Sequence, residues 1–124
     1  MTEQLFFLDT YALFEIIRGN PAYEKFENAA TATTIFNLAE FNWALKKEKD
    51  KFTSDSLTKK FESILVEVTV NDIISSMDFR QTQKGLSIPD AIGYVIAKHL
   101  NAKFVTGDRA FENLENVEYI KKIT

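Results

Sequence analysis

Cysteine is absent from this chain of 124 residues, which excludes disulfide bonds, thiolate metal ligands and a cysteine nucleophile. The absence also fits a reducing compartment, so we expect a cytoplasmic protein. No apolar run reaches the length of about 18 residues that a membrane-spanning helix needs, so none is expected. The first residues, MTEQLFFLD, carry an acid at Glu3 and enter a strand-like segment, unlike a secretory signal peptide.

An excess of positive charge is also missing, because the formal net charge is −3. Proteins that only coat nucleic acid are usually basic. If this chain contacts a polyanion, something must offset its acidic residues, and a bound divalent cation is the simplest candidate. Apolar residues make up 45% of the chain, which is enough for the core of a single domain spanning residues 1–124.

Short apolar segments alternate with helical patterns along the chain. This alternation predicts an α/β fold, with a mostly parallel central sheet covered by helices on both faces. The expected strands are 5–8, 32–34, 104–105 and 117–120, and 67–70 is either a short strand or an extended linker. The expected helices are 11–18, 21–29, 35–49, 53–65, 71–85, 87–101 and 109–113.

Turn and cap residues mark the ends of these helices. Gly19 is expected to end the first helix, with Pro21 as the first residue of the next, and Gly85 is expected to end a later one. The charged run KKEKDK at 46–51 indicates a solvated helix end or connector. The expected N-caps are Asn20, Thr53 or Ser54, Asn71 or Asp72, and Ser87.

Two apolar segments end in an acid, FFLDTY at Asp9 and FVTGD at Asp108. In a parallel sheet, ligands bind beyond the carboxyl ends of the strands, where both acids are expected to lie. Each acid alone also fits a helix cap or a turn. The same holds for Asp90, which falls in the first turn of the helix that follows Ser87.

Glu40 differs from these acids because it lies in the middle of a helix, in NLAEFNWAL, where no cap is needed. A glutamate on a mostly apolar helix face is costly unless it is paired, protonated or bound to a metal. The plain alternative is an ion pair with a lysine or arginine. Its neighbours at three and four positions are Phe36, Asn37, Trp43 and Ala44.

Four converging carboxylates would need a counter-charge. At about 5 Å and an effective dielectric constant of about 20, each pair repels by about 3 kcal/mol. Protons or a cation would relieve that repulsion. Because the chain offers carboxylates, no cysteine and one histidine, the donor set favours Mg²⁺ or Mn²⁺ over zinc or copper. That histidine, His99, is expected to be structural rather than a ligand.

The ordered set of motifs resembles the PIN-domain family, and most of all the small VapC-type toxin ribonucleases. The resemblance runs through the whole chain, with Gly93-Tyr94 as a departure where small residues such as alanine are more usual. The residues that carry it are Asp9-Thr10, Glu40, Asp90-Ala91 with Ala97, and Thr106-Gly107-Asp108 followed by Phe111.

The resemblance implies a PIN-like three-layer fold and a metal-dependent endoribonuclease. The metal would activate water for in-line attack on an RNA phosphodiester. Thr10 and Thr106 would orient the acids or the bound water. A small antitoxin partner and a homodimer are implied as well. The implied catalytic residues, which would also hold one or two Mg²⁺ or Mn²⁺ ions, are Asp9, Glu40, Asp90 and Asp108.

Two other side chains have alternative interpretations. Arg109 would bind a substrate phosphate or form a salt bridge with Asp108. Trp43 is expected in the core rather than as a platform for base stacking.

Two other functions remain open. One is a PIN-like module that binds RNA or protein without cutting. The other is a phosphate-handling enzyme or receiver domain. This second alternative is disfavoured because no second aspartate lies two residues after Asp9 and no lysine is placed to grip a phosphoryl oxygen.

Overall fold

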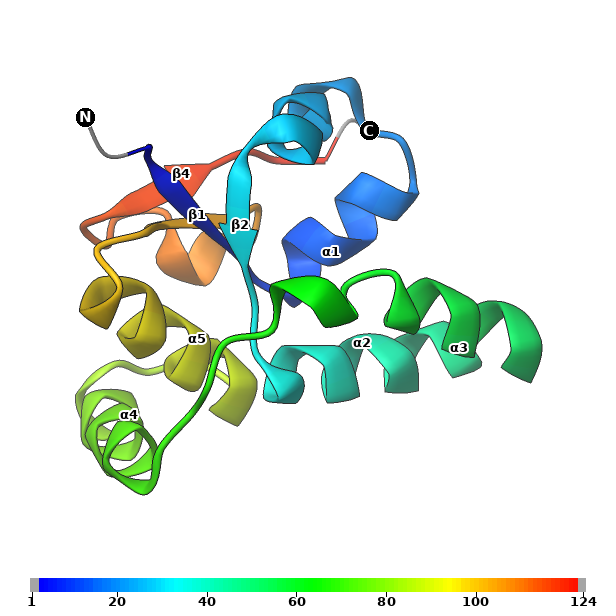
Figure 1. Ribbon diagram of the computed structural model, residues 1–124. Coiled ribbons are helices and arrows are strands. Elements are labelled where there is room, and N and C mark those ends of the chain that lie inside the picture. Colours follow the sequence, from blue (N-terminus) through cyan, green and yellow to red (C-terminus); the bar gives the residue numbers. More distant parts are fainter. Residues whose placement is uncertain (1–2, 123–124) are drawn as a thin grey trace.

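Four parallel strands form the centre of the fold in the computed structural model, which describes residues 3–122 (Figure 1). Their order across the sheet is β2-β1-β3-β4, so the first strand of the chain lies inside the sheet. The predicted α/β architecture is therefore confirmed. The strands are β1 (Leu5–Leu8), β2 (Ala30–Ala32), β3 (Lys103–Thr106) and β4 (Val117–Tyr119).

Helices connect these strands and cover both faces of the sheet (Figure 1). None of the helices within residues 3–122 is both long enough and apolar enough to cross a bilayer. The α-helices are α1 (Thr10–Ile17), α2 (Ile35–Lys46), α3 (Lys51–Lys59), α4 (Val70–Thr82) and α5 (Ile88–His99). Short 3₁₀ helices are η1 (Pro21–Asn28), η2 (Glu62–Ile64) and η3 (Arg109–Phe111).

Alternation along the two central strands divides the core into two clusters. Phe7 pairs with Phe104 and Leu8 pairs with Val105 in the register of β1 and β3. Since successive side chains of a strand point to opposite faces, the two phenylalanines lie in one cluster while Leu8 and Val105 lie in the other. All four side chains are buried, as expected for a parallel sheet covered on both faces.

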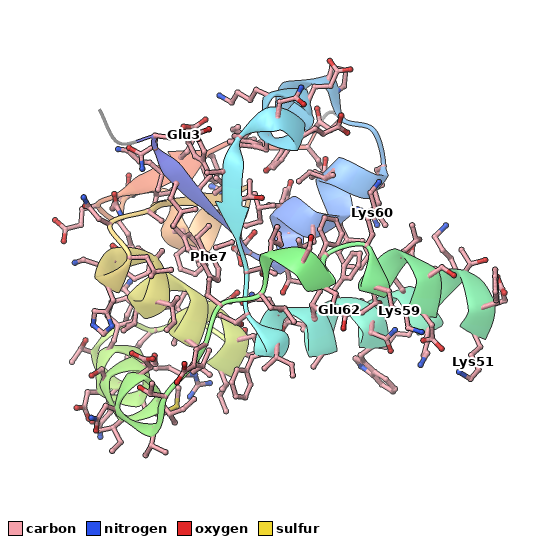
Figure 2. The ribbon with its side chains drawn as sticks, viewed as in Figure 1. Glu3, Phe7, Lys51, Lys59, Lys60 and Glu62 are labelled. Atoms are coloured by element: carbon pink, nitrogen blue, oxygen red, sulfur yellow. The ribbon has the colours of Figure 1, made fainter. Side chains whose placement is uncertain are left out.

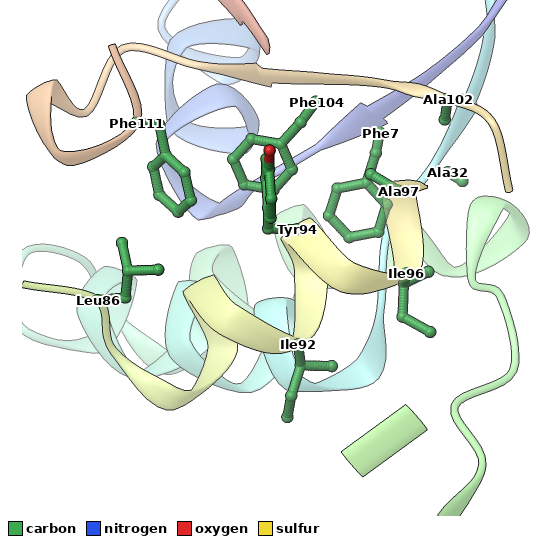
Figure 3. Close-up of a cluster of buried hydrophobic side chains, with 10 residues drawn as sticks. All are labelled: Phe7, Ala32, Leu86, Ile92, Tyr94, Ile96, Ala97, Ala102, Phe104 and Phe111. Atoms are coloured by element: carbon green, nitrogen blue, oxygen red, sulfur yellow. The ribbon is translucent and has the colours of Figure 1, made fainter. Parts of the chain in front are cut away.

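The first cluster is an aromatic layer between the sheet and α5 (Figure 3). The rings of Phe7 and Phe104 stack with centroids 5.7 Å apart, and Phe111 lies 4.6 Å from Phe104. Tyr94 of α5 packs edge-on against Phe104, and its hydroxyl donates to the Glu115 carbonyl at 2.7 Å. Residues 91–97 of α5 are all buried, because α4 covers the outer side of this helix. The helix whose first turn holds Asp90 is therefore a buried one.

The second cluster joins the opposite face of the sheet to α1, η1 and α2. The rings of Phe14 and Phe41 meet edge to face with centroids 4.8 Å apart, which fixes α1 against α2. Helices α2 and α3 extend together beyond the sheet (Figure 1). Charged side chains such as Lys51, Lys59 and Glu62 line the exposed surface of this extension (Figure 2).

Gly93 explains the departure from the usual motif in α5. A Cβ atom at this position would lie 2.8 Å from Cε1 of the buried Phe7 ring. Glycine normally costs about 1 kcal/mol relative to alanine in a helix. Here glycine permits α5 to approach β1 more closely than alanine would allow.

Gly93→Ala is therefore expected to destabilise the protein by about 1–3 kcal/mol, the usual range for overpacking, instead of stabilising it. Urea unfolding monitored by circular dichroism would measure the difference. A gain in stability would show that the Phe7 ring can move aside at little cost.

Several predicted boundaries are wrong because side-chain caps act earlier than expected. The strand predicted at 32–34 is β2, which ends at Ala32, since the Thr34 hydroxyl already caps α2. The helix predicted at 35–49 ends at Lys46. Neither Thr53 nor Ser54 is the next cap, because the Asp50 carboxylate accepts the Thr53 N–H at 3.3 Å and starts α3 at Lys51. The run KKEKDK therefore holds a helix end and the start of the next helix.

The boundaries of α4 also differ from the prediction. Thr69 is the N-cap, rather than Asn71 or Asp72, because the Thr69 hydroxyl accepts the Asp72 N–H and the Asp72 carboxylate accepts the Thr69 N–H. The helix ends at Thr82, before Gly85, which has φ +88° in the following loop. Residues 66–69 form the extended linker that the sequence left as one alternative. The helix expected to reach residue 65 ends at residue 59, with η2 following.

Candidate active site

The central pair of strands, β1 and β3, brings the first and last acid together. From β1 the chain moves to β2 on one side and later returns to β3 on the other side. Such a switch in strand order opens a crevice at the carboxyl ends of the strands. Asp9 follows β1, and its N–H donates to the Val105 carbonyl of β3 at 3.3 Å. Asp108 follows β3 two residues beyond its end.

Asp9 is a helix cap and a buried acid at the same time. Its Oδ1 accepts the Ala12 N–H at 2.8 Å, which caps α1, and only 1% of the residue is exposed. Burial raises the pKa of this carboxyl well above its usual value, and the Thr106 hydroxyl and the Ala12 N–H offset part of that rise. The cap interpretation is correct, but it does not account for placing a carboxylate under the surface.

Asp108 caps η3 through Oδ1, which accepts the Ala110 N–H at 3.0 Å. Its own N–H donates to the Thr106 hydroxyl at 3.0 Å. Thr106 is fully buried, so the hydroxyl serves both acids of the crevice: it orders the turn at Asp108 and lowers the pKa of Asp9.

Asp90 enters the crevice from the start of α5. Its Oδ2 accepts the Ser87 N–H at 3.1 Å, while its N–H donates to the Ser87 hydroxyl at 3.1 Å. Burial raises the pKa of Asp90 from 3.8 to about 6, against the lowering effect of the Ser87 backbone N–H. The negative charges of Glu40 and Asp108 raise it further. These carboxylates are therefore near enough to repel one another.

Glu40 forms none of the ion pairs found within residues 3–122, which excludes the plain alternative of a lysine or arginine partner there. It is partly buried on α2, and its charge acts on Asp90. The helix face that carries Glu40 is less apolar and less covered than predicted, because Trp43, three residues later, is 65% exposed and is not the core residue that the sequence predicts. Glu40 thus faces the acids from a helix that is only half covered.

The structure thus brings all four predicted acids into one electrostatic neighbourhood. The charges of Asp90 and Asp108 raise the pKa of Asp9, and those of Glu40 and Asp108 raise the pKa of Asp90. In the described part of the chain, no lysine or arginine neutralises any of the four. Arg109 is exposed and does not form the salt bridge with Asp108 that was one alternative.

The donor set fits a hard divalent cation in its chemistry. All four groups are carboxylates. A divalent cation would offset the burial of Asp9 and Asp90, which is the main cause of their raised pKa values, and the repulsion from neighbouring acids, which adds to it. Across residues 3–122, however, no three histidine or acidic side chains are already arranged to hold a metal ion. Three of the acids each use one oxygen to accept a backbone N–H.

Two polar residues next to the acids, Thr10 and Asn37, are joined by a hydrogen bond. The Thr10 hydroxyl, whose expected role is to orient an acid or water, accepts a hydrogen bond from the Asn37 amide of α2 at 3.3 Å. Asn37 is fully buried and was not singled out from the sequence. The available signal was an amide in the otherwise apolar stretch IFNLAE, one helical turn before Glu40.

Comparison with known proteins agrees with this fold. The family model described as PIN domain matches residues 6–117. A toxin-antitoxin complex from Klebsiella pneumoniae contains a chain similar to this one, with a TM-score of 0.74 and 20% identity over 95% of this chain and 99% of that one. A comparison with curated proteins finds no significant match.

Two further solved structures are similar at the same level of identity. VapBC2 from Rickettsia felis, bound to a DNA fragment from its promoter, gives a TM-score of 0.69 and 20% identity, covering 97% of this chain and 100% of that one. PAE2754 from Pyrobaculum aerophilum gives a TM-score of 0.73 and 20% identity, covering 96% of this chain and 92% of that one. At these identities the similarity supports the fold.

Proposed function

Because the chain belongs to the PIN domain family, we propose that it is a nuclease, and specifically a divalent-metal-dependent endoribonuclease that hydrolyses RNA phosphodiesters. The observation that carries this proposal is the group of four acids at the switch point of the sheet, none of which has a lysine or arginine partner among residues 3–122. Such a group costs free energy unless it has a function or a bound cation. The family match covers the stretch that contains all four.

The four acids Asp9, Glu40, Asp90 and Asp108 would hold Mg²⁺ or Mn²⁺. A bound divalent cation supplies a water of lowered pKa and stabilises charge on the phosphate oxygens. Asp9, under the surface, and Asp108, on the turn after β3, would contribute carboxylates from the ends of the two central strands. Because the pKa of Asp90 is raised to about 6, its carboxyl holds a proton in part of the molecules at neutral pH, and it would have to release that proton to act as a ligand.

Substrate contacts would come from groups around the crevice. The chain has a formal net charge of −3, so the acids themselves repel RNA until a cation is bound. Arg109 follows Asp108 directly and is exposed without a partner acid in the described residues, so it can contact a phosphate.

We further propose that the chain is the toxin of a toxin-antitoxin pair and that it forms a homodimer. Similarity to chains of toxin-antitoxin complexes supports the first part. Large apolar side chains left uncovered on α2 and α3 are consistent with a protein partner, since Trp43 is 65% exposed and Phe52 is 80% exposed. Release of cleavage activity after removal of a small co-purifying protein would test this assignment.

The nuclease proposal predicts RNA cleavage that requires Mg²⁺ or Mn²⁺ and stops in EDTA. Asp9→Asn should lower the rate by about a hundredfold or more, because asparagine can still cap α1 but brings no negative charge to the cation. Gel analysis of structured and single-stranded RNA would measure both effects. Glu27→Gln, at an exposed residue of η1, is the matched control and should cut at the wild-type rate.

Cleavage that survives unchanged in Asp9→Asn would contradict the proposed site. A second candidate, a PIN-like module that binds RNA or protein without cutting, is favoured by one observation: within residues 3–122 the acids are not preassembled around a metal position. Titration calorimetry with MnCl₂ separates the two candidates. A non-catalytic module whose acids serve only as caps should bind no Mn²⁺ at this site.

A further inference from the structure

Asn37 is a fully buried polar side chain in the middle of the helices that carry the acids. A buried amide costs free energy unless its donor and acceptor are both satisfied. Here Oδ1 accepts a hydrogen bond from the Thr34 hydroxyl at 2.6 Å, and Nδ2 donates to the Thr10 hydroxyl at 3.3 Å. The amide therefore uses its acceptor and one donor, on two different segments of the chain.

These contacts join the first turn of α2 to the first residue of α1. The Thr34 hydroxyl also accepts the Asn37 N–H at 3.2 Å, so the same pair caps α2. The Thr10 hydroxyl faces the Asn37 carbonyl at 3.5 Å in addition to the amide. Since Thr10 directly follows Asp9, the placement of α2 depends on the position of the first acid.

A third acid-bearing helix meets the same amide. A Cβ atom on Gly93 of α5 would lie 3.3 Å from Asn37 Oδ1, so the backbone of α5 passes directly over it. Gly93 follows Asp90 by three residues, which is about one helical turn. On its own helix, Asn37 precedes Glu40 by the same spacing.

We propose that Asn37 is a positioning residue, which sets the relative placement of the segments that carry Asp9, Glu40 and Asp90. It cannot touch substrate, because it is fully buried. Hydrogen bonds fix direction and distance, whereas an apolar side chain of the same size would let α1 and α2 slide past each other. Against α5, Asn37 acts by packing alone, through the close approach at Gly93. This inference rests on the proposed function, since the helices need this placement only if their acids act together.

Asn42 offers a matched control on the same helix. Its Nδ2 donates to Asp55 Oδ1 at 3.1 Å and to the Thr58 hydroxyl at 2.9 Å, which joins α2 to α3 away from the acids. Asn37→Leu removes a buried amide that joins α2 to α1, and Asn42→Leu removes a part-buried amide that joins α2 to α3. Only the first amide contacts the segments that carry the acids.

The test measures Mn²⁺ affinity by titration calorimetry and unfolding by urea for the whole chain. Both leucine variants should lose stability, because each leaves hydroxyl partners unsatisfied. Asn37→Leu should also lower Mn²⁺ affinity by about tenfold or more, as loss of a group that orients metal ligands usually does. Asn42→Leu should bind Mn²⁺ as the wild type does.

Thr10→Val is a milder variant that keeps the proposal testable if Asn37→Leu does not fold. It removes only the hydroxyl between Asn37 and the residue after Asp9, and it should lower Mn²⁺ affinity in the same direction. In the double variant Thr10→Val/Asn37→Leu, the two losses of Mn²⁺ affinity should not add, because both substitutions break the same hydrogen bond between Thr10 and Asn37.

Mn²⁺ affinity that stays at the wild-type value in both Asn37→Leu and Thr10→Val would overturn the inference and leave the nuclease proposal standing. An equal loss in Asn42→Leu would also overturn it, since the effect would then be one of general stability. A wild-type protein that binds no Mn²⁺ would refute the proposed function, and the positioning role with it.

Discussion

Asp90→Asn is expected to make the metal-free protein more stable at neutral pH while removing its metal-dependent cleavage. Asparagine can still accept the Ser87 N–H and complete the cap of α5. It has no negative charge that burial would destabilise or that Glu40 and Asp108 would repel. Loss of one carboxylate from the cation site should lower the cleavage rate by about a hundredfold or more.

The sign of the stability change follows from the raised pKa. Because folding raises the pKa of Asp90 from 3.8 to about 6, the unfolded chain gives up this proton at lower pH than the folded one. Stability from this group is therefore fully present below about pH 4 and is lost as the pH rises through about 6. The rise in pKa corresponds to about 3 kcal/mol of destabilisation of the folded protein by the charged Asp90 carboxylate. Asparagine removes this destabilisation, but it also loses the favourable interaction of the negative charge with the helix dipole, which is worth about 1 kcal/mol.

A stabilisation of about 1–2 kcal/mol at pH 7 is thus expected for Asp90→Asn in EDTA, and little change at pH 4. Urea unfolding at the two pH values measures it. Excess Mn²⁺ should reverse the order at pH 7, because the cation binds the folded wild type more tightly than the variant. Equal stability of the two proteins at pH 7 without metal would show that neither burial nor the neighbouring acids destabilise the Asp90 carboxylate in the folded protein.

Asp72 provides the control, because it occupies the same position in the same local motif. Thr69 and Asp72 form a capping box at the start of α4, as Ser87 and Asp90 do at the start of α5. Yet the pKa of the Asp72 carboxyl is lowered, mainly by the hydrogen bond from the Thr69 backbone N–H, and its other contact is His99 at 3.2 Å rather than another acid. At pH values above 4, Asp72→Asn should therefore reduce the free energy of unfolding by a small amount, which is the opposite direction to Asp90→Asn.

Gly107→Ala is expected to destabilise the protein by about 3 kcal/mol or more, at the upper end of overpacking effects. An added Cβ atom would lie 2.2 Å from Cε1 of the Tyr11 ring and 2.6 Å from the Ile120 carbonyl oxygen. Both distances are far below contact, so one of these groups or the strand end would have to move.

Neither group next to Gly107 is free to move. The Tyr11 hydroxyl accepts the Lys122 N–H at 2.8 Å. Ile120 is held through its N–H, which donates to the Thr106 carbonyl at 2.8 Å, and through its carbonyl, which accepts the Tyr23 hydroxyl at 2.6 Å. Any shift must therefore break hydrogen bonds, or displace the turn that places Asp108.

Thermal unfolding of Gly107→Ala should show a midpoint lower by about 10 °C or more. Gly19→Ala is the control, since Gly19 has φ +75° but open space where the Cβ would lie. That variant should cost only the strain of a left-handed alanine, about 1–2 kcal/mol. A Gly107→Ala protein as stable as Gly19→Ala would show that the contact with Tyr11 relaxes easily.

The apolar segments were enough to predict the parallel sheet. In LFFL, Phe7 and Leu8 are buried on opposite faces of the sheet and the two residues before them are partly buried, and the prediction of β1 as residues 5–8 is confirmed to the residue. Helix starts were harder, because several hydroxyl and carboxylate side chains within a few positions can each serve as the cap. At α3 the true cap was Asp50, inside a run that appeared only solvated, and at α4 it was Thr69.

Exposure was the other quantity that local pattern did not decide. Trp43 is a large apolar residue in an apolar stretch of helix, yet α2 projects beyond the sheet and leaves 65% of it exposed. Asn37, six residues earlier on the same helix, is fully buried where α1 and α5 converge on α2. Composition along the helix does not reveal which of its sides another element will cover.

Local sequence pattern was enough to identify the residues that could carry chemistry. It placed each candidate after a strand or in a helix, and these candidates are Asp9, Glu40, Asp90 and Asp108. Only the tertiary structure decided how deeply each of them is buried and in which direction its pKa is shifted. Asp72 and Asp90 share one capping motif, but Asp72 lies beside His99 and has a lowered pKa, while Asp90 has a raised pKa because of burial and of the acids around it. The physical reason is that hydrogen bonds of a cap arise within four residues, whereas burial and repulsion come from segments far away in the chain.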